Sequence, residues 1–320
     1  MHHRTRQRAV LPVALITLTT LTACQEAAAP DQPAAPGAPL YAAARIGPTG
    51  KGIGTRSYSI GPRTRYRLEW HNGPVMLGSV RVYLIMYGDW ADPTGAHPTQ
   101  AYLADFAASL NASSYLKINS LYGDGTASPD GSLIFGRSIA VGYPYGQTLT
   151  DGDIAQVVSD AVTTGLLPID MNGIYAVVAS QDVWASSGLG TAYCAFRNNV
   201  IEPRYNQRLK FVFIGHPARN PAQCAPQLSG PGGDYAADAM VSLLAVEISN
   251  TITDPNLDGW YDRLGLEMAD KCAWDFGPTY QAPNGALANI QLDNRHYLLP
   301  RLWVQDKRNS GYCGLALPGT

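Results

Sequence analysis

The sequence has few charged residues, few cysteines and no excess of positive charge. Charged residues make up 15% of the 320 positions, and 23 Lys and Arg stand against 25 Asp and Glu. A nucleic-acid-binding protein normally carries a clustered excess of positive charge, so we exclude nucleic acid as a partner. The five cysteines include no pair with C-x₂-C spacing, which disfavours a zinc site made of thiolates.

Two common sequence motifs of enzymes are also missing. The turn Gly230–Gly233 lacks the lysine and the Ser/Thr that a phosphate-binding P-loop requires. The loop Ser186–Gly190 does not match Gly-x-Ser-x-Gly, the motif around a nucleophilic serine. These absences disfavour P-loop nucleotide chemistry and serine hydrolysis of that class.

The first 24 residues have the features of an export signal. A basic start is followed by an apolar run from Ala9 to Leu21, which is too short for a stable membrane span. The run ends in Leu-Thr-Ala-Cys at Cys24, which matches a bacterial lipobox. We therefore predict a lipoprotein signal peptide at 1–24 and a lipid on Cys24. The exported protein would be attached to a membrane, in the periplasm or at the cell surface. A plain secretory signal that ends by chance in cysteine is the alternative.

A proline-rich segment separates this signal from the rest of the chain. Gln25–Ala44 is rich in Ala and Pro and has no periodic apolar pattern. We predict that residues 25–68 form a flexible tether. Residues 69–320 are enough for one domain with a single core.

Four further cysteines agree with an exported protein. Cys194, Cys224, Cys272 and Cys313 form an even set. An oxidising compartment favours disulfides between them over zinc binding by their thiols. Four cysteines permit three pairings, and their spacing does not choose among these.

Segments typical of strands and helices alternate from Pro74 onwards. β-Branched and aromatic runs predict strands at Ser79–Tyr87, Ser132–Val141, Gly173–Ala179 and Leu209–Ile214. Apolar periodicity and capping residues predict helices at about Thr99–Leu110, Thr150–Thr164 and Tyr235–Ser249. This order predicts an α/β fold with a mixed, largely parallel sheet, flanking helices and a loop-rich C-terminal part. We expect the third and fourth strands to include an antiparallel edge.

Short stretches spread over most of the predicted domain point to a known family. They are, in chain order, Gly73–Val75, Leu84–Gly88, Tyr193-Cys194, Cys224-Ala225, Asp238–Val241, Thr253–Pro255, Gly259–Tyr261, Asp270–Cys272, Arg295–Pro300 and Cys313. Together they resemble the plant phosphate-induced protein 1 (EXORDIUM-like) family and its bacterial relatives. The resemblance implies an extracellular or cell-wall protein linked to growth signalling, without an established chemistry.

The resemblance also implies how the cysteines pair. At two positions where the family leads us to expect further cysteines, this sequence has Asn198 and Asn220. Their joint absence suggests that those two cysteines pair with each other in the family. The bridges then implied here are Cys194–Cys224 and Cys272–Cys313.

Some bacterial-type members carry a His-Glu pair on the helix before the Thr-Asp-Pro segment, which implies a zincin-like core. A zincin helix needs His-Glu-x-x-His, because residues four apart lie one turn above each other and both reach one metal. Here the five positions read Val246-Glu247-Ile248-Ser249-Asn250. The histidines after the signal are scattered: His71, His97, His216 and His296. We therefore disfavour zinc and predict a degenerate site.

Glu247 lies on the apolar face of this predicted helix, one turn from Leu243 and Leu244. A buried carboxylate is costly unless it is paired or hydrogen-bonded, and burial raises the pKa of such a group, as in a general acid or base. Glu247 is thus a candidate catalytic residue. Alternatively, backbone N–H groups or an arginine hold it, or it is the vestige of a lost active site, which is the interpretation we favour.

The loop after this helix is similar to part of a calcium-binding loop. From Asp254 to Asp262, oxygen donors occupy positions 1, 3, 5 and 9, and glycine occupies position 6, as in an EF-hand. Position 12 is Gly265 instead of glutamate, so the alternative is a solvated turn. The candidate Ca²⁺ ligands are Asp254, Asn256, Asp258, Asp262, Glu267 and Asp270.

We interpret the chain as a lipid-anchored EXORDIUM-like protein that binds a glycan or a protein of the cell envelope without catalysis. It would be a pseudoenzyme with a degenerate zincin-like site. The alternative is a metal-dependent hydrolase related to metallopeptidases. That enzyme would use Glu247 as general base, with Asp254, Glu267 or a distant histidine as unconventional metal ligands.

Overall fold

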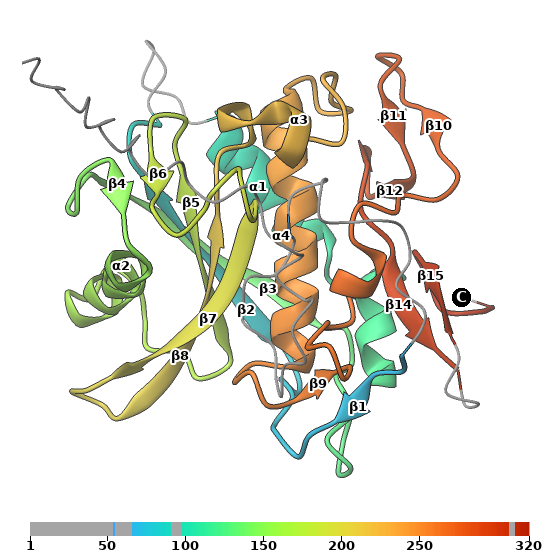
Figure 1. Cartoon of the computed structure of the whole chain (residues 1–320), viewed down its shortest axis with the longest axis horizontal. Helices are drawn as coiled ribbons and strands as arrows, with labels where there is room; N and C mark the ends of the chain where they lie inside the picture. Colours follow the sequence, from blue (N-terminus) through green and yellow to red (C-terminus); the bar gives the residue numbers. More distant parts are fainter. Residues whose placement is uncertain (1–53, 55–65, 91–97, 307–310, 320) are drawn as a thin grey trace, which may run out of the picture. The chain divides into compact units, whose positions relative to one another are not determined.

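A computed structural model describes residues 54, 66–90, 98–306 and 311–319 (Figure 1). The predicted signal peptide, its lipidation site Cys24, most of the predicted tether 25–68 and His97 lie outside the described residues. None of the helices in the described part is long and apolar enough to cross a membrane.

The centre of the fold is a five-stranded sheet (Figure 1). Its strands lie in the order β3 (Leu133–Gly142), β2 (Val80–Tyr87), β5 (Gly173–Ala179), β8 (Gln207–Ile214) and β7 (Ala195–Glu202). The first four are parallel to one another, and β7 pairs antiparallel with β8 at one edge. This arrangement confirms the predicted α/β fold with a mixed, largely parallel sheet.

The antiparallel edge differs from the expectation. The third and fourth predicted strands correspond to β5 and β8, which are parallel neighbours. The antiparallel strand is β7, which the sequence pattern did not predict because its sequence, AFRNNVIE, has Arg197 and two asparagines near its centre. Arg197 is nevertheless buried, and two carboxylates surround it, as described below.

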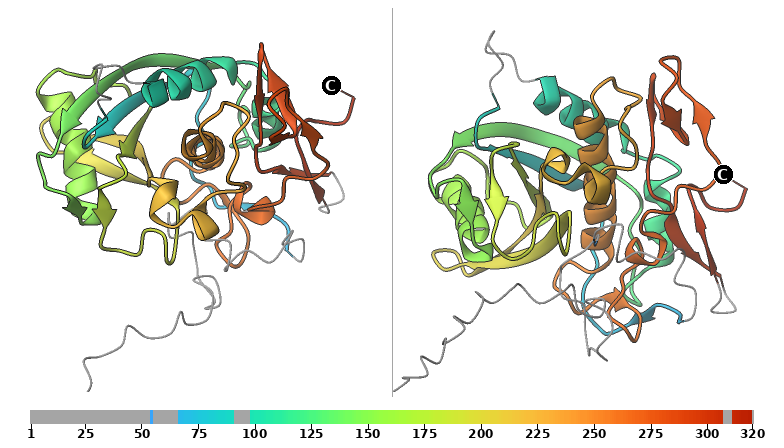
Figure 2. Two further views of the ribbon diagram at one scale, coloured as in Figure 1. Left: turned by 90° about the horizontal axis from the view of Figure 1, so that it is seen from above. Right: turned by 45° about the horizontal axis from the view of Figure 1, so that its top comes forward.

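Helices cover both faces of the sheet. α1 (Pro98–Ser109) and α4 (Tyr235–Thr253) pack against one set of alternate strand residues, and α2 (Asp151–Thr163) packs against the other set. Figure 2 shows the sheet passing between α2 and α4. Because β2, β5 and β8 are covered on both faces, their sequences are nearly continuous apolar runs instead of alternating ones.

α4 runs between the sheet and the C-terminal part of the chain (Figures 1 and 2). Every residue from Ala236 to Thr253 is buried. A helix with no solvent-facing side is expected to be apolar around its whole circumference. Three of its polar side chains, Asp238, Ser242 and Asn250, form hydrogen bonds with other parts of the protein. Asp234 caps its first turn by accepting a hydrogen bond from the N–H of Ala236 at 2.8 Å.

The remaining elements are short. Two-stranded ribbons pair β1 (Glu69–Trp70) with β9 (Trp260–Tyr261), β4 (Thr148–Leu149) with β6 (Trp184–Ala185), β10 (Tyr280–Gln281) with β11 (Leu287–Ala288), β12 (Ile290–Leu292) with β13 (Arg295–Tyr297), and β14 (Leu302–Gln305) with β15 (Gly311–Gly314). The short helical segments are η2 (Leu116–Leu121), η3 (Pro217–Arg219), α3 (Pro221–Cys224) and η4 (Asp270–Cys272). The described residues after α4 thus confirm the predicted loop-rich C-terminal part.

The disulfide pairing implied by the family resemblance is confirmed. Cys194 pairs with Cys224, and Cys272 pairs with Cys313. The bridges close loops of 30 and 41 residues, and each is expected to stabilise the fold by roughly 3–4 kcal/mol by restricting the unfolded chain. The second bridge ties η4, which follows the candidate metal loop, to the last strand of the described chain.

Candidate functional site

Glu247 lies in the middle of α4, and none of its surface is exposed. Leu243 and Leu244, one turn before it on the same face, are also fully buried. The backbone carbonyl of Glu247 accepts a hydrogen bond from the Thr251 hydroxyl at 2.6 Å. A general base must come within hydrogen-bonding reach of water or substrate. Catalysis by Glu247 would therefore require the protein to open around α4.

Asn250, at the position of the second zinc-binding histidine, holds the chain after α4 in place. Its Nδ2 donates to Asp270 Oδ1 at 3.0 Å, and its Oδ1 accepts from the N–H of Ala269 at 2.9 Å. All three residues are buried. Both ends of the amide are therefore used inside the protein. Val246, at the position of the first histidine, belongs to the apolar core.

A buried arginine from the sheet pairs with two of the candidate metal ligands. The Nε of Arg197 donates to Glu267 Oε2 at 3.1 Å, and its Nη2 donates to Asp254 Oδ2 at 2.9 Å and to Glu267 Oε1. The three side chains are at most 1% exposed. Burial raises the pKa of Asp254, although the charge of Arg197 acts in the opposite direction. One cation thus binds two acids away from water.

A second buried ion pair fixes the end of the candidate calcium loop. The Nζ of Lys271 lies 3.2 Å from Asp262 Oδ2 and 4.8 Å from the centroid of the Trp303 ring. The other oxygen of Asp262 accepts from the N–H groups of Leu264 and Leu266 at 2.8 and 3.1 Å. Asp262 therefore holds both a lysine and a tight turn.

The six candidate calcium ligands do not gather around one point. They are placed as follows: Asp254 and Glu267 at Arg197, Asp262 at Lys271, Asp270 at Asn250, Asn256 half-buried and Asp258 exposed. Within the described ranges, no group of three or more His, Cys, Asp and Glu side chains is placed to hold a metal. Calcium stays a candidate ligand of this loop, and its binding would require this region to exchange its internal ion pairs for the metal.

The described histidines pack against aromatic rings at separate places. The pairs are His71 with Tyr261, His216 with Trp90, and His296 with Tyr280. Burial lowers the pKa of His216 to about 4, so its imidazole is neutral near pH 7. These histidines therefore contribute to packing, and the three do not form a cluster with the acids of the loop.

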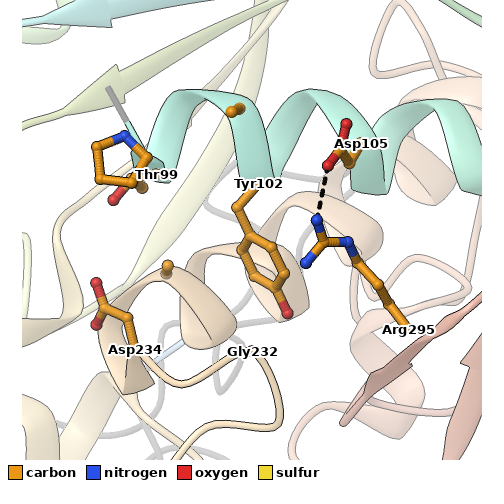
Figure 3. A pocket seen from close by; sticks show the side chains of 9 residues that line it. Thr99, Tyr102, Asp105, Gly232, Asp234 and Arg295 are labelled. Atoms are coloured by element: carbon orange, nitrogen blue, oxygen red, sulfur yellow. Dashed lines mark hydrogen bonds and ion pairs between the residues drawn. The ribbon is translucent and has the colours of Figure 1, made fainter. Parts of the chain in front are cut away.

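An open depression of about 400 Å³ lies between the first turns of α1 and α4 (Figure 3). Figure 3 shows Tyr102 extending from α1 toward the turn at Gly232, with Arg295 of β13 on one side and Asp234 on the other. Arg295 Nη2 lies 2.9 Å from Asp105 Oδ2, and its guanidinium carbon lies 5.4 Å from the centroid of the Tyr102 ring. The depression therefore has a charged rim around one aromatic ring.

Asp238 fixes the aromatic wall of this depression. Its Oδ1 accepts from the Tyr102 hydroxyl at 2.6 Å, and its Oδ2 accepts from the N–H of Gly232 at 3.0 Å. Asp238 is 6% exposed, and burial raises its pKa to about 6, although both hydrogen bonds act in the opposite direction. The same carboxylate thus joins α1, α4 and the turn before α4.

The depression offers hydrogen-bond donors and acceptors together. Arg295 can only donate, whereas the ionised carboxylates of Asp105 and Asp234 can only accept. This mixture suits a polar ligand with hydroxyl, amide or charged groups. No local sequence pattern marks this site, because its residues come from three distant segments. The one available signal was that Asp238 and Arg295 both stand in stretches that carry the family resemblance.

Comparison with known proteins shows a family similarity over nearly the whole domain. A family model described as the phosphate-induced protein 1 conserved region matches residues 68–312, most of the chain. The chain belongs to this family. The region shared with the phosphate-induced protein 1 family contains α4, Arg197 and the depression of Figure 3, whereas Cys24 precedes it.

Named relatives are plant proteins with the same family name. Protein EXORDIUM-like 3 of Arabidopsis thaliana is 28% identical over 281 residues, which cover 74% of this chain and 80% of that protein. Protein EXORDIUM-like 5 of the same plant is 27% identical over 241 residues, 66% of this chain and 65% of that protein. Protein PHOSPHATE-INDUCED 1 of Nicotiana tabacum is 26% identical over 282 residues, 74% and 85% of the two chains. The predicted family resemblance is confirmed.

Proposed function

We propose that the chain is an extracytoplasmic binding module of the cell envelope, anchored by a lipid on Cys24 and containing a degenerate zincin-like site. Its ligand is a glycan or a protein of the envelope. The observation that carries this proposal is that four of the candidate acids are buried and hold other parts of the fold: Asp254 and Glu267 bind Arg197, Asp262 binds Lys271, and Asp270 binds Asn250.

The buried contacts support binding over catalysis for a physical reason. A catalytic metal site keeps a coordination position open for water or substrate. Asp254 and Glu267 instead surround Arg197, and Asn250 bridges the backbone of Ala269 and the carboxylate of Asp270. Breaking such contacts costs several kcal/mol per buried charge. These side chains are therefore suited to stabilise the fold, and an exchangeable metal would have to displace them.

The depression of Figure 3 supports a binding role at the surface. It is open, it carries both signs of charge, and its volume of about 400 Å³ lies within the range of small-ligand sites. The two disulfides agree with a location outside the cytoplasm. A tethered module needs no more than such a site to hold a polymer or a neighbouring protein.

The test compares binding by four forms of the full chain. Wild type, Arg295→Ala, Glu247→Gln and the control Arg137→Ala, which changes an exposed arginine elsewhere, are sedimented with purified cell-wall sacculi and with envelope vesicles. We expect Arg295→Ala to bind about tenfold more weakly, since a hydrogen bond to a charged group contributes about 1.5–3 kcal/mol. Glu247→Gln and Arg137→Ala should bind like wild type.

The hydrolase alternative predicts that Glu247 is needed for the release of products. The same proteins are incubated with casein and with sacculi, with Zn²⁺ or Ca²⁺ added, and new amino termini and reducing ends are measured. Release of products by wild type that is lost in Glu247→Gln would refute the binding-only proposal. Equal sedimentation of Arg295→Ala and wild type would show that the depression is not the binding site.

A further inference from the structure

Two tryptophans lie side by side on the ribbon formed by β1 and β9. Trp70 is paired directly with Trp260 across the ribbon, and side chains opposite each other in an antiparallel pair point to the same face. Trp70 is 36% exposed, and Trp260 is partly exposed. Figure 1 shows this ribbon beyond the C-terminal end of α4, whereas α3, close to the N-terminal end of α4, is at the other end of that helix.

The fold fixes both indole rings. Trp70 Nε1 donates to the carbonyl of Gly73 at 2.7 Å, and Trp260 Nε1 donates to the carbonyl of Gly123 at 2.8 Å. Tyr122 packs edge-on against Trp260, with ring centroids 5.4 Å apart. The N–H is the only polar group of an indole, so what the rings offer a ligand is their apolar faces. Because these faces are already oriented, little conformational entropy would be lost on binding.

A cavity of about 380 Å³ opens beside the two rings, and its other walls are largely polar. Its lining consists of Arg67, Leu68, Glu69, Trp70, Trp260 and Gln305. Arg67 Nε donates to Glu69 Oε1 at 2.7 Å, and both side chains are about half exposed. A guanidinium has five N–H donors and a carboxylate has two acceptor oxygens. The ion pair can therefore also hydrogen-bond a ligand.

We propose that this cavity binds a pyranose ring of an oligosaccharide. A pyranose has a face of C–H groups and a rim of hydroxyls. The C–H face can lie on an indole, whose electron-rich face attracts weakly positive hydrogens, and the hydroxyls can reach Glu69 and Arg67. The volume suits about one or two sugar rings.

Other small ligands fit this combination less well. A purely apolar ligand would remove water from Arg67 and Glu69 without replacing its hydrogen bonds. An anionic ligand would be repelled by the carboxylate of Glu69, and a cationic ligand would be repelled by the guanidinium of Arg67. The inference rests on the proposed binding function, because it selects a glycan as ligand and assigns it to the β1–β9 ribbon, apart from the depression of Figure 3.

The experiment titrates the full chain with pentasaccharides of β-1,4-linked glucose and of β-1,4-linked N-acetylglucosamine, and measures tryptophan fluorescence and heat. We expect saturable binding of at least one of them. Trp70→Ala should weaken it about tenfold or more, and Trp70→Phe, which keeps a ring, should weaken it less. The matched control is Tyr280→Ala, because Tyr280 is 40% exposed in a different ribbon. An unchanged urea midpoint shows that each variant is folded.

Glu69→Gln tests the polar rim without changing the size of the side chain, and should also weaken binding. The inference is wrong if neither pentasaccharide binds at 10 mM, or if Trp70→Ala and Glu69→Gln bind as tightly as wild type. Arg295→Ala is titrated alongside. If it loses the sugar while Trp70→Ala keeps it, the ligand lies in the depression of Figure 3. That result overturns this inference and leaves the proposed binding function standing.

Discussion

Replacement of Arg197 by methionine tests the role of the buried acids most directly. Methionine replaces the aliphatic stem of arginine and lacks its guanidinium, so Arg197→Met leaves Asp254 and Glu267 buried without their cation. Removing one partner of a buried ion pair costs about 3–5 kcal/mol. A domain is typically stable by about 5–15 kcal/mol. We therefore expect the variant to lose about a fifth or more of its free energy of unfolding at pH 8.

The loss should depend on pH in a defined direction. Burial already raises the pKa of Asp254 in the wild type, against the charge of Arg197. Without Arg197 this pKa rises further, so the folded variant binds a proton more tightly than the unfolded chain does. Its stability then falls as pH rises from about 4 through the folded pKa. We expect the loss of free energy of unfolding relative to wild type to be small at pH 4.5 and to reach its full size at pH 8.

The assay is urea unfolding at pH 4.5 and pH 8 with the disulfides intact, followed by tryptophan fluorescence. The control is the triple variant Arg197→Met, Asp254→Asn, Glu267→Gln, which removes the uncompensated charges and should recover most of the lost stability at pH 8, since neutral replacements of a buried charge cluster are often tolerated. A loss below about 1 kcal/mol at pH 8, or a triple variant no more stable than Arg197→Met, would refute the reasoning.

Two further predictions concern Asp238 and calcium. The folded pKa of Asp238 is raised to about 6 by burial, so ionisation destabilises the fold, and stability is lost as pH rises from about 4 to 6. Asp238→Asn should reduce the change in the free energy of unfolding between pH 4 and pH 6 by up to about 3 kcal/mol. If the change is the same as in the wild type, other groups cause the pH dependence. For calcium, we expect the same melting temperature in excess chelator and in 5 mM CaCl₂, because Asp254 and Asp262 already hold Arg197 and Lys271. A rise of several degrees with calcium would show that the loop takes up the metal.

Elements with a strong local pattern can be predicted from this sequence. The strand Gly173–Ala179 is observed with the predicted bounds, because an apolar run buried on both faces is distinct from its polar flanks. α2 begins where predicted, because Thr150 and Asp153 form a reciprocal capping box that works without tertiary contacts. In these cases, the residues that decide the structure are neighbours in the chain.

β7 and the depression of Figure 3 could not be predicted in this way. Arg197 gives β7 a polar centre, and this centre is stable only because Asp254 and Glu267 arrive from segments 57 and 70 residues later. The depression likewise depends on Arg295 reaching Asp105 across 190 positions. Sequence periodicity contains no information about such partners. A charged residue within an otherwise strand-like segment is the only local indication that one exists.

The contacts of Asn250 bear on whether a metal could bind where a zincin helix would carry its histidines. In a zincin, the residue four positions after the first ligand faces a metal in an open cleft. In this protein the amide of Asn250 faces Ala269 and Asp270, so protein atoms lie on the side where a metal would be expected. Val246 is packed in the core at the other ligand position. Histidines at these two positions would remove the contacts that Asn250 makes with Asp270 and with the N–H of Ala269. Each buried group left without a partner would lower the free energy of unfolding by about 1–3 kcal/mol. Replacing two side chains would therefore not be enough to create a metal site. The packing of residues 267–272 against α4 would also have to change.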